Sequence, residues 1–343
     1  MLGPRLSLLL QQAWASRWHP LSLLLLPVSW VFVAVAWLRK HAYRSHLLKV
    51  VDLPVPVCVV GNVSAGGGGK TPLVVELCRR LRSRDLHVGI IARGYGGMSQ
   101  SWPVLLDNLS QAGQVGDEAV LLRDETQFPV AAGPDRAASA QALLRAHPEV
   151  DVIVSDDGLQ HWRLGRAFEL LVEDAAFDFG NGRPLPAGPL REHAKRFSNA
   201  RYALRKNAHN PEAGYVLRPA GLRRLGHEGE QSPDAFRNEA IHALVGIARP
   251  EGFLATLDSL GYVYEPCVFP DHHRYELSDL DGLSSRKILT TTKDAARLER
   301  FAGRFDIWVL RTHVELTPPG DAVLQQLVEE ITHNITQSFN RRP

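Results

Sequence analysis

The sequence predicts an α/β fold in which a mostly parallel sheet carries helices on both of its faces. Three observations lead to this class. Apolar, strand-like runs alternate with helical patterns along most of the chain, a glycine-rich turn joins one such strand to a helix, and no repeat of fixed period is present. At 343 residues the chain is long enough for two domains.

The composition argues against several classes of protein. Lys and Arg number 39 against 37 Asp and Glu, which gives a net charge of +2. The overall charge therefore predicts neither a nucleic-acid-binding protein nor an acidic tail. The three cysteines, Cys58, Cys78 and Cys267, are far apart and form no CxxC pair. Their spacing argues against a disulfide framework or a zinc site and fits a reducing compartment.

The first 45 residues differ from the rest in composition. No charge occurs from Leu21 to Leu38, and basic residues flank this stretch on both sides. Its length is at the lower limit for a membrane span, and Pro27 would kink a helix there. Upstream, an apolar face fits a helix lying on a bilayer surface and comprises Leu6, Leu9, Leu10, Ala13 and Trp14. We interpret residues 1–45 as a membrane-associated helical segment, either monotopic or a single membrane helix. A buried core helix is the alternative.

A strand, a glycine-rich turn and a helix follow one another from residue 55 to residue 81. Residues 55–60 form an apolar run of the β type, and residues 61–71 read Gly-Asn-Val-Ser-Ala-Gly-Gly-Gly-Gly-Lys-Thr. The apolar residues that follow fall on one helical face and are Leu73, Val74, Leu77, Cys78 and Leu81. This order of elements is the setting that a phosphate-binding loop, or P-loop, requires.

The chemistry of the turn supports phosphate binding. The glycines Gly66, Gly67, Gly68 and Gly69 let backbone N–H groups converge on phosphate oxygens, and the helix N-terminus adds positive potential. Lys70 would reach the β- and γ-phosphates, and the Thr71 hydroxyl would ligate Mg²⁺. Ser64 stands where the usual pattern has glycine. A P-loop NTPase-like domain is therefore predicted, with a glycine turn that binds nothing as the alternative.

The rest of this first domain, residues 46–204, continues the alternation of strands and helices. Strands are expected at residues 87–92, 129–132, 150–154 and 168–172, and helices at 118–123 and 136–146.

Residues 205–238 interrupt the alternation. They are polar, rich in Arg and turn-forming, and we interpret them as an interdomain linker. A second, smaller α/β domain at 239–343 follows. Its expected strands are 240–247, 262–269, 287–291 and 307–311, and its expected helices are 250–260, 294–301 and 321–335.

Two pairs of acidic residues could take part in nucleotide chemistry. Asp156 and Asp157 end an apolar strand, where carboxylates at the carboxyl edge of a sheet hold Mg²⁺ beside a P-loop. Asp117 and Glu118 begin a helical pattern, and an N-cap with a first-turn acid is the alternative interpretation.

Three further motifs carry chemically active side chains. Arg93 and Tyr95 lie on a glycine-rich turn directly after a strand, which places a guanidinium and an aromatic ring near the expected phosphates. His272 follows Asp271, and a His beside a carboxylate can act as a general base, although surface or cap chemistry is the commoner case. Residues 292–294, Thr-Lys-Asp, suggest either a guanine-specificity loop or, better supported by residue type and spacing, a helix start.

The combination of these motifs resembles the tetraacyldisaccharide 4′-kinases, the lipid A 4′-kinase family of Gram-negative bacteria. The matching segments occur in the family's order between about residues 55 and 300 and are residues 61–72, 93–97, 115–118, 156–161, 180–192, 269–273 and 291–295. The family's loop usually carries a small hydroxyl residue at the position of Ser64. Gly68 departs from the family, which typically has Thr, Ser or Asn there.

The resemblance implies transfer of the γ-phosphate of ATP to the 4′-hydroxyl of tetraacyldisaccharide 1-phosphate. By this resemblance Asp117 and His272 activate the hydroxyl and Lys70 holds the phosphates. The remaining roles it implies are metal binding by Thr71, Asp156, Asp157 and Glu118 and substrate binding by Asn62, Arg93, Tyr95, Glu118 and Gln160.

The same resemblance implies a place for the protein and a site between its domains. We expect a monomer at the cytoplasmic face of the bacterial inner membrane, with ATP, Mg²⁺, the lipid substrate and the membrane surface as its partners and no nucleic acid. His272 and Asp117 come from different predicted domains, so the active site should lie in the cleft between them. The alternative function is a P-loop GTPase or metallochaperone-type switch that acts through a protein partner, with residues 292–294 as its support.

Overall fold

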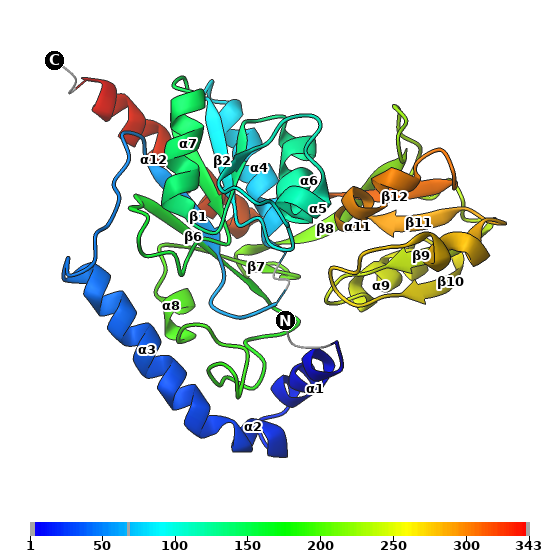
Figure 1. Ribbon diagram of the computed structural model, residues 1–343, viewed down its shortest axis with the longest axis horizontal. Helices are drawn as coiled ribbons and strands as arrows, with labels where there is room; N and C mark the ends of the chain where they lie inside the picture. The colour runs from blue at the N-terminus through cyan, green and yellow to red at the C-terminus, as the bar shows by residue number, and fades with distance from the viewer. Residues whose placement is uncertain (1–3, 67–68, 341–343) are drawn as a thin grey trace.

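One continuous sheet of 12 strands runs through the whole protein in the computed structural model, which describes residues 4–66 and 69–340 (Figure 1). The order of the strands is β10-β9-β11-β12-β8-β7-β6-β1-β5-β2-β4-β3. Parallel pairs dominate, and the antiparallel pairs are β3 with β4 and β8 with β12. The predicted α/β class with a mostly parallel sheet is confirmed. The predicted phosphate-binding residues Gly67 and Gly68 lie outside the described residues.

The first half of the sheet surrounds the strand that leads into the glycine-rich turn. β1 (Val57–Gly61) lies between β5 (Val152–Asp156) and β6 (Phe168–Asp174), parallel to both. The other strands of this half are β2 (Val88–Ala92), β3 (Val104–Leu105), β4 (Val130–Ala132) and β7 (Tyr202–Lys206). All five residues of β1 are buried, as expected for a central parallel strand with both faces covered.

Helices cover both faces of this half. Because side chains alternate along a strand, Cys58 and Val60 of β1 enter one core cluster while Val57 and Val59 enter another. The first cluster receives α4 (Lys70–Arg82), α5 (Ala112–Val115), α6 (Asp117–Thr126) and α12 (Pro318–Asn340), and the second receives α7 (Arg136–Ala146) and α8 (Lys195–Ser198).

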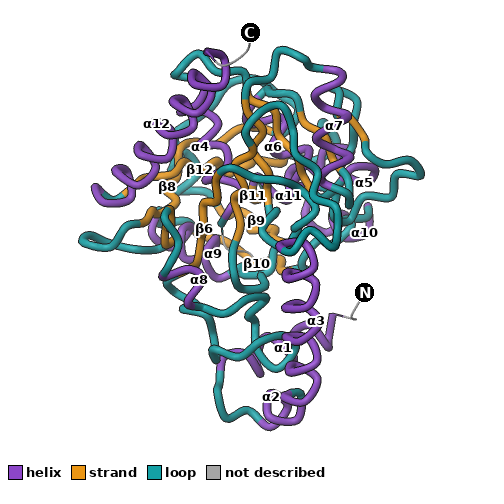
Figure 2. Tube along the Cα trace, turned by 90° about the vertical axis from the view of Figure 1, so that its left-hand side faces the viewer, coloured by secondary structure: helices purple, strands orange, loops and turns teal. Residues whose placement is uncertain are grey.

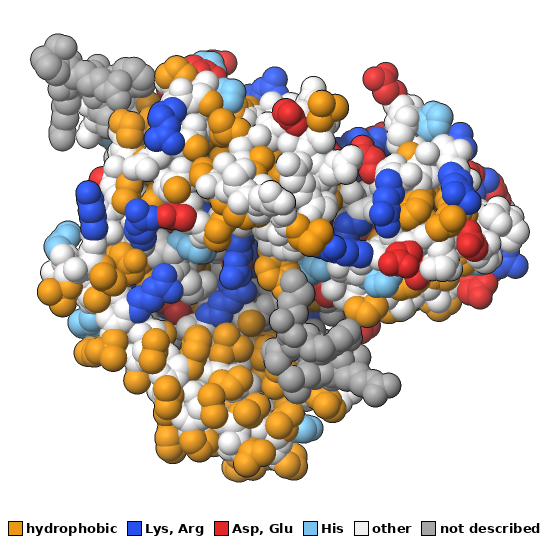
Figure 3. Space-filling view, viewed as in Figure 1, with side chains coloured by type: hydrophobic (Ala, Val, Ile, Leu, Met, Phe, Trp, Pro, Cys, Tyr) orange, Lys and Arg blue, Asp and Glu red, His pale blue; other side chains and the backbone are white. Residues whose placement is uncertain are grey.

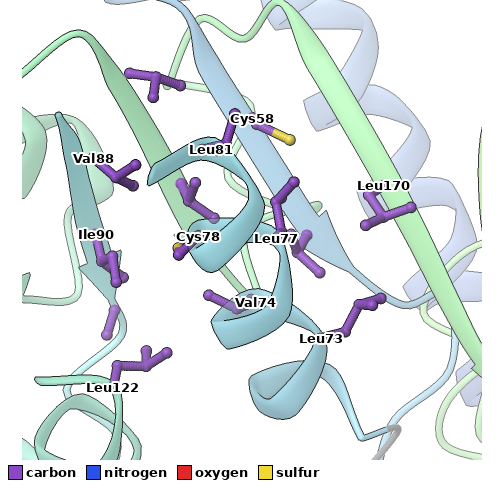
Figure 4. Close-up of a cluster of buried hydrophobic side chains, with 14 of the residues drawn as sticks. Cys58, Leu73, Val74, Leu77, Cys78, Leu81, Val88, Ile90, Leu122 and Leu170 are labelled. Atoms are coloured by element: carbon purple, nitrogen blue, oxygen red, sulfur yellow. The ribbon is translucent and has the colours of Figure 1, made fainter. Parts of the chain in front are cut away.

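The predicted apolar face of α4 is the one that packs on the sheet. Figure 4 shows Leu73, Val74, Leu77, Cys78 and Leu81 pointing toward the strands, and all five are fully buried. Burial of a leucine side chain contributes about 1.5–3 kcal/mol, so this face fixes the helix that carries Lys70 at its first position.

The second half of the sheet is joined to the first by two long antiparallel strands, β8 (Gly214–Arg224) and β12 (Ile307–Leu316) (Figure 1). Beyond them lie β11 (Ile288–Thr291), β9 (Ala240–Val245) and β10 (Val263–Val268), which are parallel to one another. The helices of this half are α9 (Glu251–Ser259), α10 (Leu277–Leu280), α11 (Thr292–Leu298) and the 3₁₀ turns Asp281–Leu283 and Glu299–Phe301.

Two elements differ from the expected organisation. The predicted linker at 205–238 contains β8, a strand of 11 residues that pairs with β7 at its beginning and with β12 along most of its length. The predicted last helix is α12, and it returns to the first half, where Leu324, Leu327 and Val328 join the core cluster of α4. The domain ranges 1–45, 46–204 and 239–343 stay predictions, and the packing adds α12 to the body that holds the glycine-rich turn.

The N-terminal segment forms three helices outside the sheet, α1 (Pro4–Ala15), α2 (Pro20–Leu24) and α3 (Leu26–Arg44). Figure 2 shows them projecting beyond the body. The uncharged stretch is divided at Leu25, and Pro27 falls in the first turn of α3, where a missing N–H costs little. Ser29 is the one buried residue of α3, so the alternative of a buried core helix is wrong. No helix within the described residues has the length and apolar character needed to span a membrane.

Candidate active site

The glycine-rich turn lies at the carboxyl end of β1. Gly69 caps α4 with a left-handed φ of 70°, and the Tyr215 hydroxyl donates a hydrogen bond to its carbonyl oxygen at 2.8 Å. A Cβ atom at Gly69 would be strained by this φ and would lie 2.5 Å from Cδ of Lys206, which would have to move, so glycine is favoured here. Gly66, at the other side of the undescribed pair, also has a positive φ, of 115°. The backbone geometry therefore favours glycine at both described positions of the turn.

Ser64 faces a buried carboxylate. Its Oγ lies 2.7 and 2.9 Å from the two carboxylate oxygens of Glu173, and both residues are buried. Burial raises the pKa of Glu173, and the hydrogen bond from Ser64 opposes part of that rise. The hydroxyl at this position thus ties the turn to the end of β6.

Lys70 and Asp157 belong to one charged cluster. Lys70 Nζ donates to Asn62 Oδ1 at 3.2 Å and lies 3.4 Å from Asp157 Oδ1. Arg191 Nη1 donates to both oxygens of Asp157 at 3.1 Å. Burial alone would raise the pKa of Asp157, but the charges of Lys70 and Arg191 lower it well below its usual range. Asp157 therefore stays ionised, and its carboxylate is already paired with the side chains of Lys70 and Arg191.

Asp156 is in a different environment from its neighbour. The Thr71 hydroxyl donates to Asp156 Oδ2 at 3.4 Å, while the buried Oδ1 has no hydrogen-bond partner among the described residues. Burial and the negative charge of Glu118 raise the pKa of Asp156 to about 7, against the attraction of Lys70. An unpartnered buried carboxylate oxygen beside a threonine hydroxyl fits one side of a Mg²⁺ site.

The remaining predicted metal ligand, Glu118, is engaged elsewhere. Glu118 Oε1 lies 3.0 Å from Lys293 Nζ. Within residues 4–66 and 69–340, no three His, Cys, Asp or Glu side chains come close enough together to hold a metal ion. Mg²⁺ commonly takes one or two carboxylates and completes its shell with water and substrate phosphates. Thr71 and Asp156 fit that kind of site, whereas Asp157 and Glu118 are paired with cations.

His272 and Asp117 contact one another across the two halves of the protein. His272 Nδ1 lies 2.9 Å from Asp117 Oδ2, and the two residues are 155 positions apart in the chain. Burial alone would raise the pKa of Asp117, but the hydrogen bond from His272 and the charges of Lys293 and Arg297 lower it overall. The ionised carboxylate can only accept, so the Nδ1–H of His272 donates to it and leaves Nε2 as the proton acceptor of the neutral ring.

Tyr95 borders this pair, and Arg93 lies next to Tyr95. The Tyr95 and His272 rings meet edge to face with their centroids 4.9 Å apart, and the Arg93 guanidinium lies 5.6 Å from the centre of the Tyr95 ring. A cavity of about 590 Å³ opens here, with Tyr95, Asp117, His272 and Arg297 in its wall. The pair is therefore open to a ligand on one side.

Residues 291–298 settle the two interpretations of the Thr-Lys-Asp motif. Thr291 caps α11 by accepting from the backbone N–H of Asp294, which confirms the helix start. The Asp294 carboxylate is buried and accepts from the Tyr275 hydroxyl at 2.7 Å and from the Gly246 N–H at 3.1 Å. It is used inside its own half and is not presented to a base.

Two cations of α11 reach the site: Lys293, noted from the sequence only as part of the Thr-Lys-Asp motif, and Arg297, which the sequence did not single out. Lys293 pairs with Glu118, and Arg297 Nε lies 3.5 Å from Asp117 Oδ2. Burial lowers the pKa of Lys293, but the charges of Glu118 and Asp117 outweigh it and raise the pKa overall. Lys293 and Arg297 are four residues apart, which places both on one helical face. This spacing is the sequence signal that could have marked them as acting together.

Gln160 belongs to a polar chain that leads away from the turn. Gln160 Nε2 donates to Glu192 Oε1 at 3.0 Å, and Arg191 donates to Gln160 Oε1 at 3.3 Å. Glu192 also accepts from Lys40 of α3 at 3.2 Å. The site is thus connected through side chains to the N-terminal helices.

The glycine- and proline-rich segment 180–188 fastens those helices to the body. Asn181 Nδ2 donates to the Ala13 carbonyl at 3.3 Å and to Ser22 Oγ at 2.9 Å. Ser29 Oγ donates to the Pro184 carbonyl and accepts from the Ala187 N–H, both at 3.0 Å. This segment therefore has a structural task in positioning α1, α2 and α3.

The strand, glycine turn and helix, together with the buried aspartate beside Thr71 and the facing His–Asp pair, define a P-loop phosphotransferase. Residues 21–332 match the model of the tetraacyldisaccharide-1-P 4′-kinase family. The chain belongs to this family, which confirms the resemblance found in its motifs.

Individual relatives agree with the family. The tetraacyldisaccharide 4′-kinase of Thiobacillus denitrificans is 45% identical over 305 residues, covering 86% of this chain and 92% of the relative. That of Azoarcus sp. is 42% identical over 329 residues, covering 93% and 94%. Among solved structures, the "apo" form of LpxK from Aquifex aeolicus in complex with ATP matches with a TM-score of 0.74 at 27% identity, covering 90% of this chain and 99% of that one.

Proposed function

We propose that this protein transfers the γ-phosphate of ATP to the 4′-hydroxyl of tetraacyldisaccharide 1-phosphate. The contact between His272 and Asp117 carries the proposal, because it pairs a proton acceptor from one half of the protein with a carboxylate of the half that contains the glycine-rich turn. The family and its named relatives favour this kinase over a GTPase switch, and the use of Asp294 within its own half removes the motif on which the switch depended.

Different groups of the site would bind the phosphates, bind the metal and accept the proton during phosphoryl transfer. Lys70 and the turn would hold the phosphates of ATP, and Thr71 with Asp156 would hold Mg²⁺. When bound, Mg²⁺ supplies positive charge that neutralises the phosphate oxygens. Glu118 and Asp117 are neighbours in the chain, and Glu118 is close enough to Asp156 to raise its pKa. The His272–Asp117 pair therefore adjoins the metal side of the site and can take the proton of an incoming hydroxyl.

The substrate-binding roles of Asn62, Arg93, Tyr95 and Gln160 are part of the same proposal. Tyr95 borders the cavity beside His272, where a sugar could stack on its aromatic ring, and Arg93 lies against that ring. Asn62 accepts a hydrogen bond from Lys70, so it would act on the phosphate side of the site. Gln160 donates to Glu192, so it would act on the side of the site that faces α3.

The N-terminal helices support a monotopic position on the cytoplasmic face of the inner membrane. Their buried side chains include the small polar Ser22 and Ser29, while the outward side is apolar. The most exposed large apolar residues there are Trp18, Leu24, Val28, Trp30, Val31, Val35, Trp37 and Leu38. Figure 3 shows this apolar surface over the part of the molecule where α2 and α3 lie. A surface of this kind is typical of a helix seated in lipid headgroups and would hold the enzyme at its lipid substrate.

The proposal is tested by incubating the purified protein with ATP, Mg²⁺ and the disaccharide lipid and finding the added phosphate by mass spectrometry. One chain supplies both the turn and the His–Asp pair, so we expect the monomer to be active. Asp117→Ala and His272→Ala should each lower kcat by about 10²–10⁴-fold with little change in ATP affinity, because they act on the hydroxyl. Lys70→Ala should weaken both turnover and ATP binding. Near-normal turnover of His272→Ala would show that the pair is not the base, and dependence on GTP without an acceptor would favour the switch.

A further inference from the structure

Two cations and one carboxylate lie beside the glycine-rich turn, outside the residues assigned above. Asp174, at the end of β6, is buried and accepts at Oδ2 from Arg249 Nη1 at 3.2 Å and from Lys206 Nζ at 3.4 Å. Asn207 Nδ2 donates to the other oxygen, Oδ1, at 2.8 Å. One carboxylate thus holds two cations in place, and the cluster keeps a net positive charge.

Both cations border the described glycines of the turn. Arg249 Nη2 lies 3.9 Å from the position that a Cβ atom would take on Gly66. Lys206 Cδ lies 2.5 Å from the corresponding position on Gly69. The backbone N–H groups of such a turn converge on phosphate oxygens, so the two cationic side chains border the place where the phosphates of a nucleotide would bind.

Arg249 comes from the second half of the protein, although the turn belongs to the first. It lies between β9 and α9, and its guanidinium is stacked over the Phe177 ring at 4.2 Å from the ring centre. The ring and Asp174 fix the direction of the side chain, while about a third of it (35%) remains exposed and open to a ligand. A rigid, bidentate donor of this kind suits a phosphate oxygen better than a lysine does.

We propose that Arg249 contacts the phosphates of the bound nucleotide as an arginine finger supplied by the same chain, with Asp174 and Lys206 positioning it. The inference rests on the proposed phosphoryl transfer. In that step the acceptor oxygen bonds to the γ-phosphorus, the bond from this phosphorus to the β–γ bridging oxygen breaks, and the electron pair leaves with ADP. The hydroxyl proton passes to His272, and Arg249 keeps its protons while neutralising charge on the transferred group.

A purely structural role predicts something different. If the ion pair of Arg249 with Asp174 only ties the two halves together, its loss should lower thermal stability and weaken the ground-state complex with ADP. A finger acts on the transition state, so its loss should lower kcat and spare ADP affinity.

The test uses the full-length protein and its variants Arg249→Ala and Arg249→Lys, with Arg304→Ala as the control. Arg304 is an exposed arginine of the same half, and the one interaction of its side chain among the described residues is with the neighbouring Phe305 ring. Three quantities are measured: kcat with ATP and the lipid, the Kd of ADP, and the Kd of ADP with Mg²⁺ and aluminium fluoride, which mimics the transferred phosphoryl group.

We expect Arg249→Ala to lower kcat and to weaken the aluminium fluoride complex by about 10²–10³-fold, the usual cost of removing one donor to transition-state charge, with the Kd of ADP within about threefold of wild type. Arg249→Lys should recover less than a tenth of the loss, and Arg304→Ala should match wild type. A kcat of Arg249→Ala within about threefold of wild type, or equal losses in both affinities, would overturn the inference. If Arg249→Ala does not fold, the same readouts on Arg249→Lys decide the question. A wild-type protein that binds ADP but phosphorylates no lipid would refute the proposed function instead.

Discussion

Replacement of Asp156 by Asn should stabilise the metal-free protein while removing its activity. Asp156 ends β5, its Oδ1 is buried without a hydrogen-bond partner among the described residues, and the Thr71 hydroxyl reaches only Oδ2. Burial and the charge of Glu118 raise its pKa from 3.8 to about 7. Asn keeps the shape of the side chain but cannot ionise, so Asp156→Asn removes the charge whose burial is unfavourable.

The sign of the effect follows from the two pKa values. Between about pH 4 and pH 7 the folded protein holds a proton on Asp156 that the unfolded chain has released, so stability falls as the pH rises through this window. Above pH 7 the full cost is present and is on the order of a few kcal/mol, which corresponds to a change in Tm of about 5 °C for a protein of this size. Asp156→Asn should therefore raise Tm at pH 8 in the absence of metal and raise it clearly less at pH 5, where only about a third of the cost is present.

Thermal unfolding of wild type and variant at pH 5 and pH 8, with EDTA or with Mg²⁺ and ATP, measures this effect. Mg²⁺ and ATP should stabilise the wild type more at pH 8, where no proton competes for the carboxylate, and should stabilise Asp156→Asn much less. The kcat of Asp156→Asn should fall by at least about 10²-fold, the usual cost of removing one group that stabilises transition-state charge.

The neighbouring Asp157 provides the control, because the charges of Lys70 and Arg191 move its pKa in the opposite direction. Its ionised form stabilises the fold at any pH above its lowered pKa, so Asp157→Asn should destabilise the protein at both pH 5 and pH 8. If Asp156→Asn lowered Tm equally at both pH values, the carboxylate would be ionised under ordinary conditions and the reasoning would be refuted.

Two further substitutions, each with a matched control, test the hydrogen bond of Ser64 and the exposed apolar surface of α3. Ser64→Ala should lower the free energy of unfolding by about 1–3 kcal/mol, because it leaves the buried Glu173 without the donor that the serine provides. Ser45→Ala removes an exposed hydroxyl and should change the free energy of unfolding by less than about 0.5 kcal/mol. Urea titrations measure both values. Val31→Glu should reduce flotation with lipid vesicles and lower kcat/KM for the lipid while ATP affinity is kept. Val263→Glu, at an equally exposed valine of β10, should do neither, and equal flotation of the two variants would contradict the membrane role of α3.

The elements that local pattern could define were predicted correctly. The spacing of apolar residues in α4 and the runs that became β1, β2 and β5 are properties of short stretches of chain, and each lies where it was expected. β8 was interpreted as part of a linker because most of its positions are at least partly exposed and therefore accept polar and arginine residues, which hide the apolar pattern of a strand. α12 was predicted as a helix, but no local signal shows that it packs on α4 rather than on the half that precedes it.

The site was predictable to the extent that its residues lie in motifs. Lys70, Asp117, Asp156 and His272 each follow a strand or begin a helix, where functional side chains of α/β proteins gather. The electrostatic difference between Asp156 and Asp157 could not be predicted, because it depends on partners brought close only by the fold.

Arg249 shows why such partners escape prediction from sequence. It lies 75 residues from Asp174 and in the other half of the sheet. Charged pairs of this separation are numerous in any chain, so only the topology identifies the one that forms.

The N-terminal segment shows what a closer use of pattern could have added. An apolar stretch of 18 residues is equally compatible with a core helix and with a helix on a membrane, because both environments accept apolar side chains. The small polar residues decide between them. Ser22 and Ser29 are seven residues apart, close to two helical turns, so they lie on the same side of the segment. In the structure both are buried against the loop at 180–188, where backbone groups accept from their hydroxyls. A polar stripe facing inward requires the apolar residues to face outward, so the serines, more than the leucines, hold the signal for where this surface lies.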